Sequence, residues 1–349
     1  MSWLVTWGAA ATEEDLVDAA QRGDEEAFRR LVQPQTPQLH AHCYRMLGSP
    51  HDAEDVVQDA LLRAWRGLAG FDRRSSIRSW LYRITTNACF DAIARRPKRL
   101  LPLDHAPPAD AASAGTRSSV DESGWIEPYP DHAVGLDDGR ATPDARYEQR
   151  EAIELAFVAA LQHLPARQRA VLILRDVLGF AANETADVLG STAASVNSAL
   201  QRARKAAHER IPERTQLATV RSLGDERVRE VVERFGDAFE RGDTQAILSV
   251  LTEDVTFSMP PHARSWRGRR AVADSWLMPG GPPSHLRSLP THANGQPALA
   301  AYALDPAAGA YLPVALDVLT LREDSVSDVT AFRMPELFAL FGLPTRLVA

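Results

Sequence analysis

Two stretches of the chain gather the residue types that contact nucleic acids. The first combines cations with hydroxyl, amide and aromatic side chains, which suits a groove for unpaired bases and their phosphates. Its candidates are Arg73, Arg74, Ser76, Arg78, Trp80, Arg83, Asn87, Arg95, Arg96 and Lys98. The second combines small and amide side chains, which fit a major groove, with cations that reach phosphates. Its candidates are Ala194, Ser195, Asn197, Ser198, Gln201, Arg202, Arg204 and Lys205.

A polar face lies on the segment between Ser49 and Trp65. Ser49 and Pro50 predict the start of a helix, as a capping residue followed by a proline in the first turn. An apolar stripe then recurs at helical spacing. The opposite face carries Asp52, Glu54, Asp55, Gln58, Asp59 and Arg63. By pattern alone this face is either solvated or a docking surface.

No group of residues has the spacing that catalysis or metal binding requires. Cys43 and Cys89 are too far apart for a CxxC motif. The histidines near Cys43 match no structural zinc pattern. The acid–base candidates of the last third are His262, His292, Asp254 and Asp317, and none of them forms a pair that demands chemistry. We therefore expect no catalytic residue, no metal and no cofactor.

Composition divides the 349 residues into three blocks and a linker. Residues 12–99 and 144–212 have helical periodicity, and residues 225–349 turn from a helix to alternating strands. Residues 100–143 are rich in Pro, Ala, Ser, Gly and Asp, which predicts a flexible linker.

The bulk properties restrict the location and the partners only weakly. The net charge of −7 does not exclude DNA binding, because binding depends on local basic patches. Two cysteines predict no disulfide framework and favour the reducing cytoplasm. No apolar stretch reaches the roughly 20 residues that a bilayer requires, so no membrane partner is expected.

The second helical block contains a helix-turn-helix pattern. Glu184 to Leu189 forms a short helix, Gly190 ends it, and Ser191 or Thr192 caps a longer helix. The inward side of that longer helix consists of Val196, Leu200, Ala203 and Ala207. This arrangement places the second group of DNA candidates outward.

Both helical blocks resemble the sigma factors of bacterial RNA polymerase. Asp52 to Trp65 resembles region two, in which this helix docks on the clamp helices of the largest polymerase subunit, and Phe71 to Asn87 resembles the part that melts and reads the −10 promoter element. Leu164 to Leu172 and Val196 to Arg204 resemble region four, which reads the −35 element. Their order, with no domain between them, is similar to the layout of the extracytoplasmic-function class. The resemblance implies core RNA polymerase and promoter DNA as partners.

Three features have two interpretations each at this stage. Trp80 belongs either to the core or to a base-stacking surface, and the cations after Asn87 belong either to a DNA contact or to a solvated helix end. The linker segment from Trp125 to Asp131 resembles a short motif of members that carry a C-terminal extension. It either threads into the polymerase cleft or forms a local aromatic turn.

The last block predicts helices first and then a curved antiparallel sheet. Ala238 to Asp243, Asp254 to Phe257 and Trp266 to Gly268 resemble the SnoaL-like, nuclear-transport-factor-two-like superfamily, whose domains are cone-shaped. A candidate pocket for a small ligand consists of Met259, His262, Trp266, Trp276 and Asp317. Catalysis, ligand sensing and regulation without a ligand all remain open for this block.

The sequence therefore predicts a multidomain protein with two all-α sigma domains, the second a helix-turn-helix, and a C-terminal α+β cone-shaped domain. The expected function is that of a sigma factor that initiates transcription at specific promoters and is regulated in cis by its last domain. The alternative is a SnoaL-like enzyme or ligand sensor fused to a DNA-binding helix-turn-helix. The segment from Asp52 to Trp65 argues against the alternative, which has no use for a polymerase-docking surface.

Overall fold

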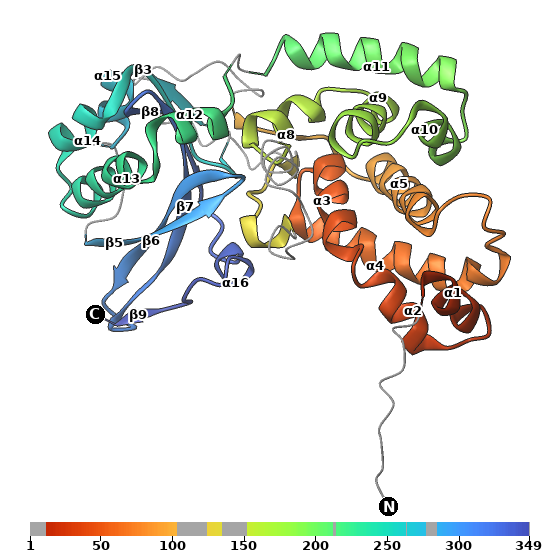
Figure 1. The fold of residues 1–349 in the computed structure, drawn as a ribbon. Helices are drawn as coiled ribbons and strands as arrows, with labels where there is room; N and C mark the ends of the chain where they lie inside the picture. Colours follow the sequence, from red (N-terminus) through yellow and green to blue (C-terminus); the bar gives the residue numbers. More distant parts are fainter. Residues whose placement is uncertain are drawn as a thin grey trace, which may run out of the picture.

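The computed structural model describes residues 12–102, 124–134, 152–211, 214–262, 264–276 and 285–348. These residues form a helical lobe and a lobe built on a twisted sheet, with α8 (Leu155–Gln162) beside the junction (Figure 1).

The first helical domain has five helices, each begun by a local signal. Side chains of Thr12, Asp24, Ser49 and Ser76 cap four of them by accepting a backbone N–H of the first turn. The central helix, α3, is buried from Ala41 to Leu47. The helices are α1 (Glu13–Gln21), α2 (Glu25–Val32), α3 (Thr36–Leu47), α4 (Pro50–Gly67) and α5 (Ile77–Arg95), with a 3₁₀ turn, η1 (Leu68–Gly70), after α4.

Residues 125–130 of the predicted linker are buried in the structure. The strand β2 (Gly124–Trp125) pairs in parallel with β1 (Arg99–Leu100), and η3 (Asp131–Val134) follows. Ile126 and Tyr129 are fully buried. The composition of residues 100–143 conceals this because the buried residues come from a single aromatic segment within a polar stretch.

The second helical domain has the predicted helix-turn-helix. It consists of α8, α9 (Ala166–Leu172), a π-helical turn η4 (Ile173–Val177), α10 (Ala182–Leu189) and α11 (Ala193–His208). Gly190 ends α10 with φ of 57°, a left-handed conformation that glycine adopts without strain. Helices α9 and α10 pack on α5 of the first domain, so the two helical domains touch.

The C-terminal domain is a seven-stranded sheet with α13 and α14 on one face and α16 on the other (Figure 1). The strand order is β4-β3-β8-β7-β6-β5, with β9 against β7. Because β3 runs parallel to β8, the sheet is mixed and not purely antiparallel as predicted. The strands are β3 (Leu251–Ser258), β4 (Ser265–Arg267), β5 (Leu286–Ala293), β6 (Gln296–Asp305), β7 (Ala310–Arg322), β8 (Ser325–Phe332) and β9 (Leu347–Val348); the helices are α12 (Gln216–Leu223), α13 (Asp225–Glu240), α14 (Thr244–Val250), α15 (Arg269–Trp276) and α16 (Leu337–Leu340).

The two faces of the sheet have different cores. One face packs against α13 and α14 through side chains such as Phe235, Leu299 and Leu319. The other face, with Ala298, Val318 and their neighbours, joins the apolar core of the helical domains. This continuity makes the C-terminal domain part of one body with the helical lobe.

The start of the second helical domain is hydrogen-bonded to the C-terminal domain. The carboxylate of Glu154 accepts the backbone N–H groups of Gln216 at 2.9 Å and Leu217 at 2.7 Å, at the start of α12. The Leu155 N–H donates to the side chain of Gln296 at 3.1 Å. The Gln216 side chain also exchanges two hydrogen bonds with the backbone of Leu321 in β7.

Candidate nucleic-acid interface

Helix α5 presents part of the predicted −10 surface to solvent. Arg83, Asn87 and Arg95 are exposed, and their spacing of four and eight residues puts them on one side of the helix. Ser76 accepts the Ser79 N–H at 3.1 Å and so caps α5. Sequence reasoning assigned Ser76 only to DNA and missed this capping role.

The beginning of α5 is covered by the second helical domain. Arg78 donates to the carbonyl of Leu178 at 3.1 Å, and its guanidinium carbon lies 4.4 Å from the ring centre of Phe180. Phe180 is 2% exposed and packs edge-on against Tyr82 at 5.1 Å. A cation held against an aromatic face is attracted by the ring quadrupole. Arg78 is therefore occupied within the protein.

The loop before α5 holds the remaining members of the first group. Arg73 pairs with Asp18, and Arg74 pairs with Asp72. The Trp80 ring lies 5.1 Å from that of Phe71 and packs partly buried against the core. Of the two interpretations of Trp80, the core contact is the one present here.

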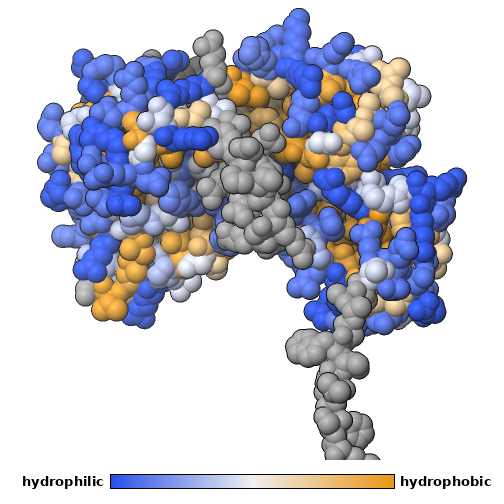
Figure 2. Space-filling view, viewed as in Figure 1, coloured by the Kyte–Doolittle hydropathy of each residue, from blue (hydrophilic) through white to orange (hydrophobic). Residues whose placement is uncertain are grey.

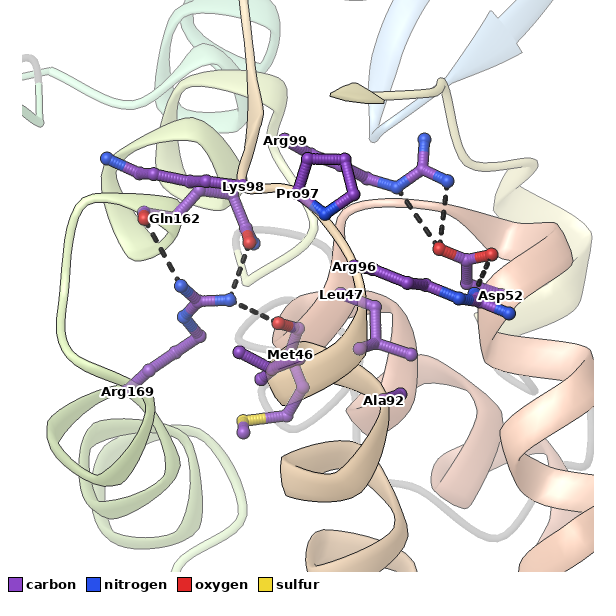
Figure 3. A pocket seen from close by; sticks show the side chains of 11 residues that line it. Met46, Leu47, Asp52, Ala92, Arg96, Pro97, Lys98, Arg99, Gln162 and Arg169 are labelled. Atoms are coloured by element: carbon purple, nitrogen blue, oxygen red, sulfur yellow. Dashed lines mark hydrogen bonds and ion pairs between the residues drawn. The ribbon is translucent and has the colours of Figure 1, made fainter. Parts of the chain in front are cut away.

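The basic residues that follow α5 also make ion pairs within the protein. Arg96 and Arg99 both pair with Asp52, Arg99 at 2.8 Å (Figure 3). Arg99 also pairs with Glu127 at 2.9 Å. Asp52 is thus paired within the protein in this arrangement, and its contact with polymerase stays a prediction. Asp52 lies in the first turn of α4, where the returning tail of α5 reaches it. Lys98 is exposed, with Nζ 3.1 Å from Nδ1 of His163.

The rest of the polar face of α4 points outward. Glu54, Asp55, Gln58 and Asp59 are exposed. Arg63 is half-buried because it pairs with Asp59 at 2.7 Å and with Asp91 of α5 at 2.8 Å. Sequence reasoning missed Leu62 on the same helix, which is 55% exposed and one of two large apolar side chains exposed among the described residues. The signal in the sequence was an apolar residue at a position outside the apolar stripe of the helix.

All eight predicted −35 residues on α11 are exposed. Val196, Leu200, Ala203 and Ala207 are buried on the opposite side, as the periodicity predicts. Thr192 caps the helix by accepting the Ser195 N–H at 3.2 Å. Arg204 is held by Asp176 at 2.7 Å. In Figure 2 polar side chains cover α11, while apolar ones gather beneath it, where Phe157, Leu172 and Ile211 line a groove of about 630 Å³.

A hairpin turn of the C-terminal domain is hydrogen-bonded to the buried linker segment. Asn294 and Gly295 join β5 to β6 with φ of 57° and 69°, the geometry of a tight type I′ turn. The Asn294 side chain donates to the Tyr44 hydroxyl at 2.8 Å and to the Ile153 carbonyl at 2.7 Å, and accepts the Tyr129 N–H at 2.8 Å. We call Asn294 and Gly295 with these partners the latch.

The latch continues into the segment from Trp125 to Asp131. The Gly295 N–H donates to the Asp131 carboxylate at 2.8 Å. Glu127, 7% exposed, accepts from Ser49 at 2.8 Å and lies 3.0 Å from Nδ1 of His51. Sequence reasoning missed Asn294 as a contact residue. The Asn-Gly pair between two alternating runs is a hairpin signal, but it does not reveal what the turn touches.

The predicted ligand-pocket residues lie in different settings. Asp317 is 4% exposed, its carboxyl forms no hydrogen bond with the described residues, and burial raises its pKa to about 7. Trp266 is buried in the core against Phe257, at 5.9 Å between ring centres. Met259 is partly buried, and burial with nearby Arg333 lowers the pKa of His262. The side chain of Trp276 lies outside the described residues.

The described residues contain neither a cluster of metal ligands nor a membrane-spanning helix. No three His, Cys, Asp or Glu side chains among them come together in a way that could hold a metal ion. None of the described helices is long and apolar enough to cross a membrane.

Comparison with known proteins identifies the three domains. Residues 31–99 match the family model of sigma-70 region 2, residues 154–206 that of sigma-70 region 4, and residues 232–329 that of the SnoaL-like domain. The ECF RNA polymerase sigma factor SigG of Mycobacterium tuberculosis is 41% identical, over 94% of this chain and 86% of the relative. The chain belongs to the ECF sigma factors. Its function is therefore to direct RNA polymerase to promoters for the initiation of transcription.

Other similar proteins agree with the assignment of this chain to the sigma factors. SigW of Bacillus subtilis is 28% identical over 56% of this chain and 94% of the relative, a range that fits the two helical domains. The crystal structure of the ECF sigma factor SigJ of Mycobacterium tuberculosis has a TM-score of 0.52, with 21% identity, and covers 88% of this chain and 96% of SigJ. At that identity the likeness concerns the fold.

Proposed function

We propose that the sigma factor binds core polymerase through α4 and reads its promoter with α5 and α11. The exposed part of the α4 face would meet the largest subunit, with Leu62 as an apolar anchor in an acidic surround. Helix α5 with its basic tail would hold the melted −10 element, and α11 would enter the major groove at −35. The sigma factor would act in the cytoplasm as a regulator and not as a catalyst.

The contact between α5 and the second helical domain carries a further part of the proposal. The −10 and −35 elements are centred about 25 base pairs apart, which is about 85 Å at about 3.4 Å per pair. Arg78 and Phe180, by contrast, are in direct contact. The arrangement here is thus a closed form, and the two domains must separate before both elements can be read at once.

We infer that the C-terminal domain holds this closed form through the latch. Asn294 is fully buried and binds the first domain at Tyr44, the linker at Tyr129 and the segment before α8 at Ile153. One side chain therefore ties three parts of the helical lobe together. Its loss would leave buried partners without hydrogen bonds, which is unfavourable.

Run-off transcription with purified core polymerase tests the proposal. Full-length protein is compared with Asn294→Ala and with Asn183→Ala, an exposed asparagine on α10 that serves as the control. We expect several-fold more transcript from Asn294→Ala at equal protein concentration. Equal transcript from all three proteins contradicts regulation by the latch. Absence of any promoter-specific transcript contradicts the assigned DNA and polymerase contacts.

A small-ligand sensor is the second candidate role for the C-terminal domain. The observation in its favour is Asp317, whose buried carboxyl has no hydrogen bond with any described residue and lies on the side of the sheet that packs against α13. Native mass spectrometry of protein from its own host would reveal a bound molecule. We expect an added mass that is absent from Asp317→Ala, and an unchanged mass contradicts this role.

A further inference from the structure

One cation of α11 is bound by a carboxylate of its own domain. The Arg204 guanidinium donates to both oxygens of Asp176, through Nε at 2.8 Å and through Nη2 at 2.7 Å. A two-point bond between a guanidinium and a carboxylate fixes the relative orientation of the two groups as well as their distance. This pair therefore connects α11 to η4 in a defined geometry.

Arg204 occupies a different side of α11 from the outward residues. It follows the buried Leu200 by four residues and precedes the buried Ala207 by three, and residues at these spacings are neighbours on one side of a helix. Ser198 and Lys205, seven residues apart, are exposed on the outward side. The side chain of Arg204 thus leaves α11 beside the buried stripe, although it is 60% exposed.

Asp176 is held in place by the turn that carries it. It belongs to η4, a π-helical turn that begins with two buried residues. The side chain of the preceding Arg175 donates to the carbonyl of Phe180, which ties the segment after the turn. Helix α9, which leads into η4, packs along α11 (Figure 1). Asp176 is therefore a fixed point beside the second half of α11.

We propose that Arg204 is a positioning residue for −35 recognition: it acts through Asp176 to orient α11 and does not contact a DNA phosphate. The apolar packing of α11 on α9 has no preferred direction, whereas the two-point bond has one. An exposed ion pair adds little to stability, so the expected effect is on the angle of the helix. The inference rests on the proposed function, because it assumes that α11 reads the −35 element.

A phosphate contact by Arg204 would have the opposite consequences. Asp176 would then compete with DNA for Arg204, so removal of the acid would tighten binding. If Arg204 acts through Asp176, removal of either residue weakens binding. A phosphate contact also contributes about one unit to the slope of log affinity against log salt, and a positioning residue contributes nothing to it.

The test is binding of the full-length protein to a −35 duplex over a range of salt concentrations. The duplex is one that the protein selects from a random pool, and affinity is measured by fluorescence anisotropy. We expect Asp176→Ala and Arg204→Ala each to weaken binding about threefold without a change of the salt slope. The double variant should be no weaker than either single variant, because the two residues act as one unit. Tighter binding by Asp176→Ala, or a slope lowered by about one in Arg204→Ala, overturns the proposal.

A matched control separates this inference from the proposed function. Lys205→Ala changes the exposed cation next to Arg204 and is expected to lower the salt slope by about one. If Lys205→Ala responds in this way while Asp176→Ala and Arg204→Ala bind like the unchanged protein, only the positioning role is overturned. If the protein selects no duplex and Lys205→Ala has no effect, −35 reading by α11 is contradicted, and the positioning role with it.

Discussion

Two interfaces on the first helical domain differ in chemistry. The latch is polar: Asn294, Tyr44 and Tyr129 are fully buried and hydrogen-bonded to one another or to backbone. The cover on α5 is aromatic and cationic, with Phe180 against Arg78 and Tyr82. A buried hydrogen-bond network fixes one geometry and leaves unsatisfied groups when it is broken. A cation on a ring exchanges more readily for another partner, such as a nucleobase.

This difference assigns the two interfaces separate roles. In the proposed mechanism, the latch sets whether the closed form exists, and the contact of Phe180 with Arg78 sets how readily α5 becomes available once the domains loosen. Variants that act on one interface at a time should therefore have distinguishable effects.

The largest expected effect comes from breaking the latch. Asn294→Ala removes three side-chain hydrogen bonds and deprives the buried Tyr129 N–H and Ile153 carbonyl of these partners, while the Tyr44 hydroxyl keeps its bond to the Glu127 carbonyl. We expect the free energy of unfolding to fall by about 4 kcal/mol in urea denaturation. The control Asn183→Ala should stay within about 0.5 kcal/mol. A loss below about 1 kcal/mol for Asn294→Ala would mean that the latch contributes little.

The C-terminal domain, which carries the latch, contains a carboxyl that makes the stability of the protein depend on pH. The folded pKa of Asp317 is about 7, above its ordinary value of 3.8, because its charged form is desolvated. Between these values the folded chain keeps a proton that the unfolded chain releases, so stability falls as pH rises through this window. Asp317→Asn should remove this loss and stabilise the protein at pH 8 by on the order of 3 kcal/mol.

The measurement is the pH profile of unfolding for both proteins. Some slope should remain in Asp317→Asn, because burial also raises the pKa of Asp328 to about 7. Identical profiles would show that Asp317 is not protonated in the folded protein.

A smaller effect is expected from weakening the contact of Phe180 that covers α5. Phe180→Leu keeps an apolar side chain but removes the ring beneath Arg78, at a cost of about 1 kcal/mol in stability. We expect roughly fivefold tighter binding of a single-stranded −10 oligonucleotide, measured by fluorescence anisotropy. Tyr311→Leu, which removes a cation–π contact with Arg287 in the C-terminal domain, is the matched control. Equal affinity of both variants for DNA contradicts a blocking role of Phe180.

The smallest expected effect on stability concerns α10, the helix that follows Phe180. Thr185 of α10 is fully buried, and its hydroxyl has no hydrogen-bond partner. Thr185→Val should raise the free energy of unfolding by about 1 kcal/mol. Thr192→Val, which removes the cap of α11, should lower it by about 1 kcal/mol. A destabilised Thr185→Val would show that the site cannot accept the added methyl group.

Local sequence signals predicted most of the fold. Ser49 with Pro50, the apolar stripe of α11 and Gly190 each act within a few residues, so the helices and the helix-turn-helix follow from them. The alternating runs predicted β6 and β8 in the same way. The resemblance to sigma factors and to SnoaL-like domains then indicated the family, which the comparisons confirm.

Contacts between distant segments could not be predicted in this way. Asn294 is 165 residues from Tyr129, and the pairing of Asp52 with Arg96 depends on how α4 and α5 cross. Neither leaves a periodic signal, because each involves a single side chain chosen by tertiary packing. The DNA and polymerase contacts themselves remain predictions, supported by the exposure of α11 and of most of the polar face of α4.

The two ties of the second helical domain have a mechanical consequence. Glu154 binds the start of α12, and Leu155 binds Gln296, so the domain's first residues and the segment that follows α11 are both fixed to the sheet side of the molecule. Because both ties lie at the neighbouring residues Glu154 and Leu155, they act as one pivot at the start of the domain. While they hold, the reading helix α11 and the covering residue Phe180 belong to a domain that can swing about this pivot but cannot leave the sheet side of the molecule.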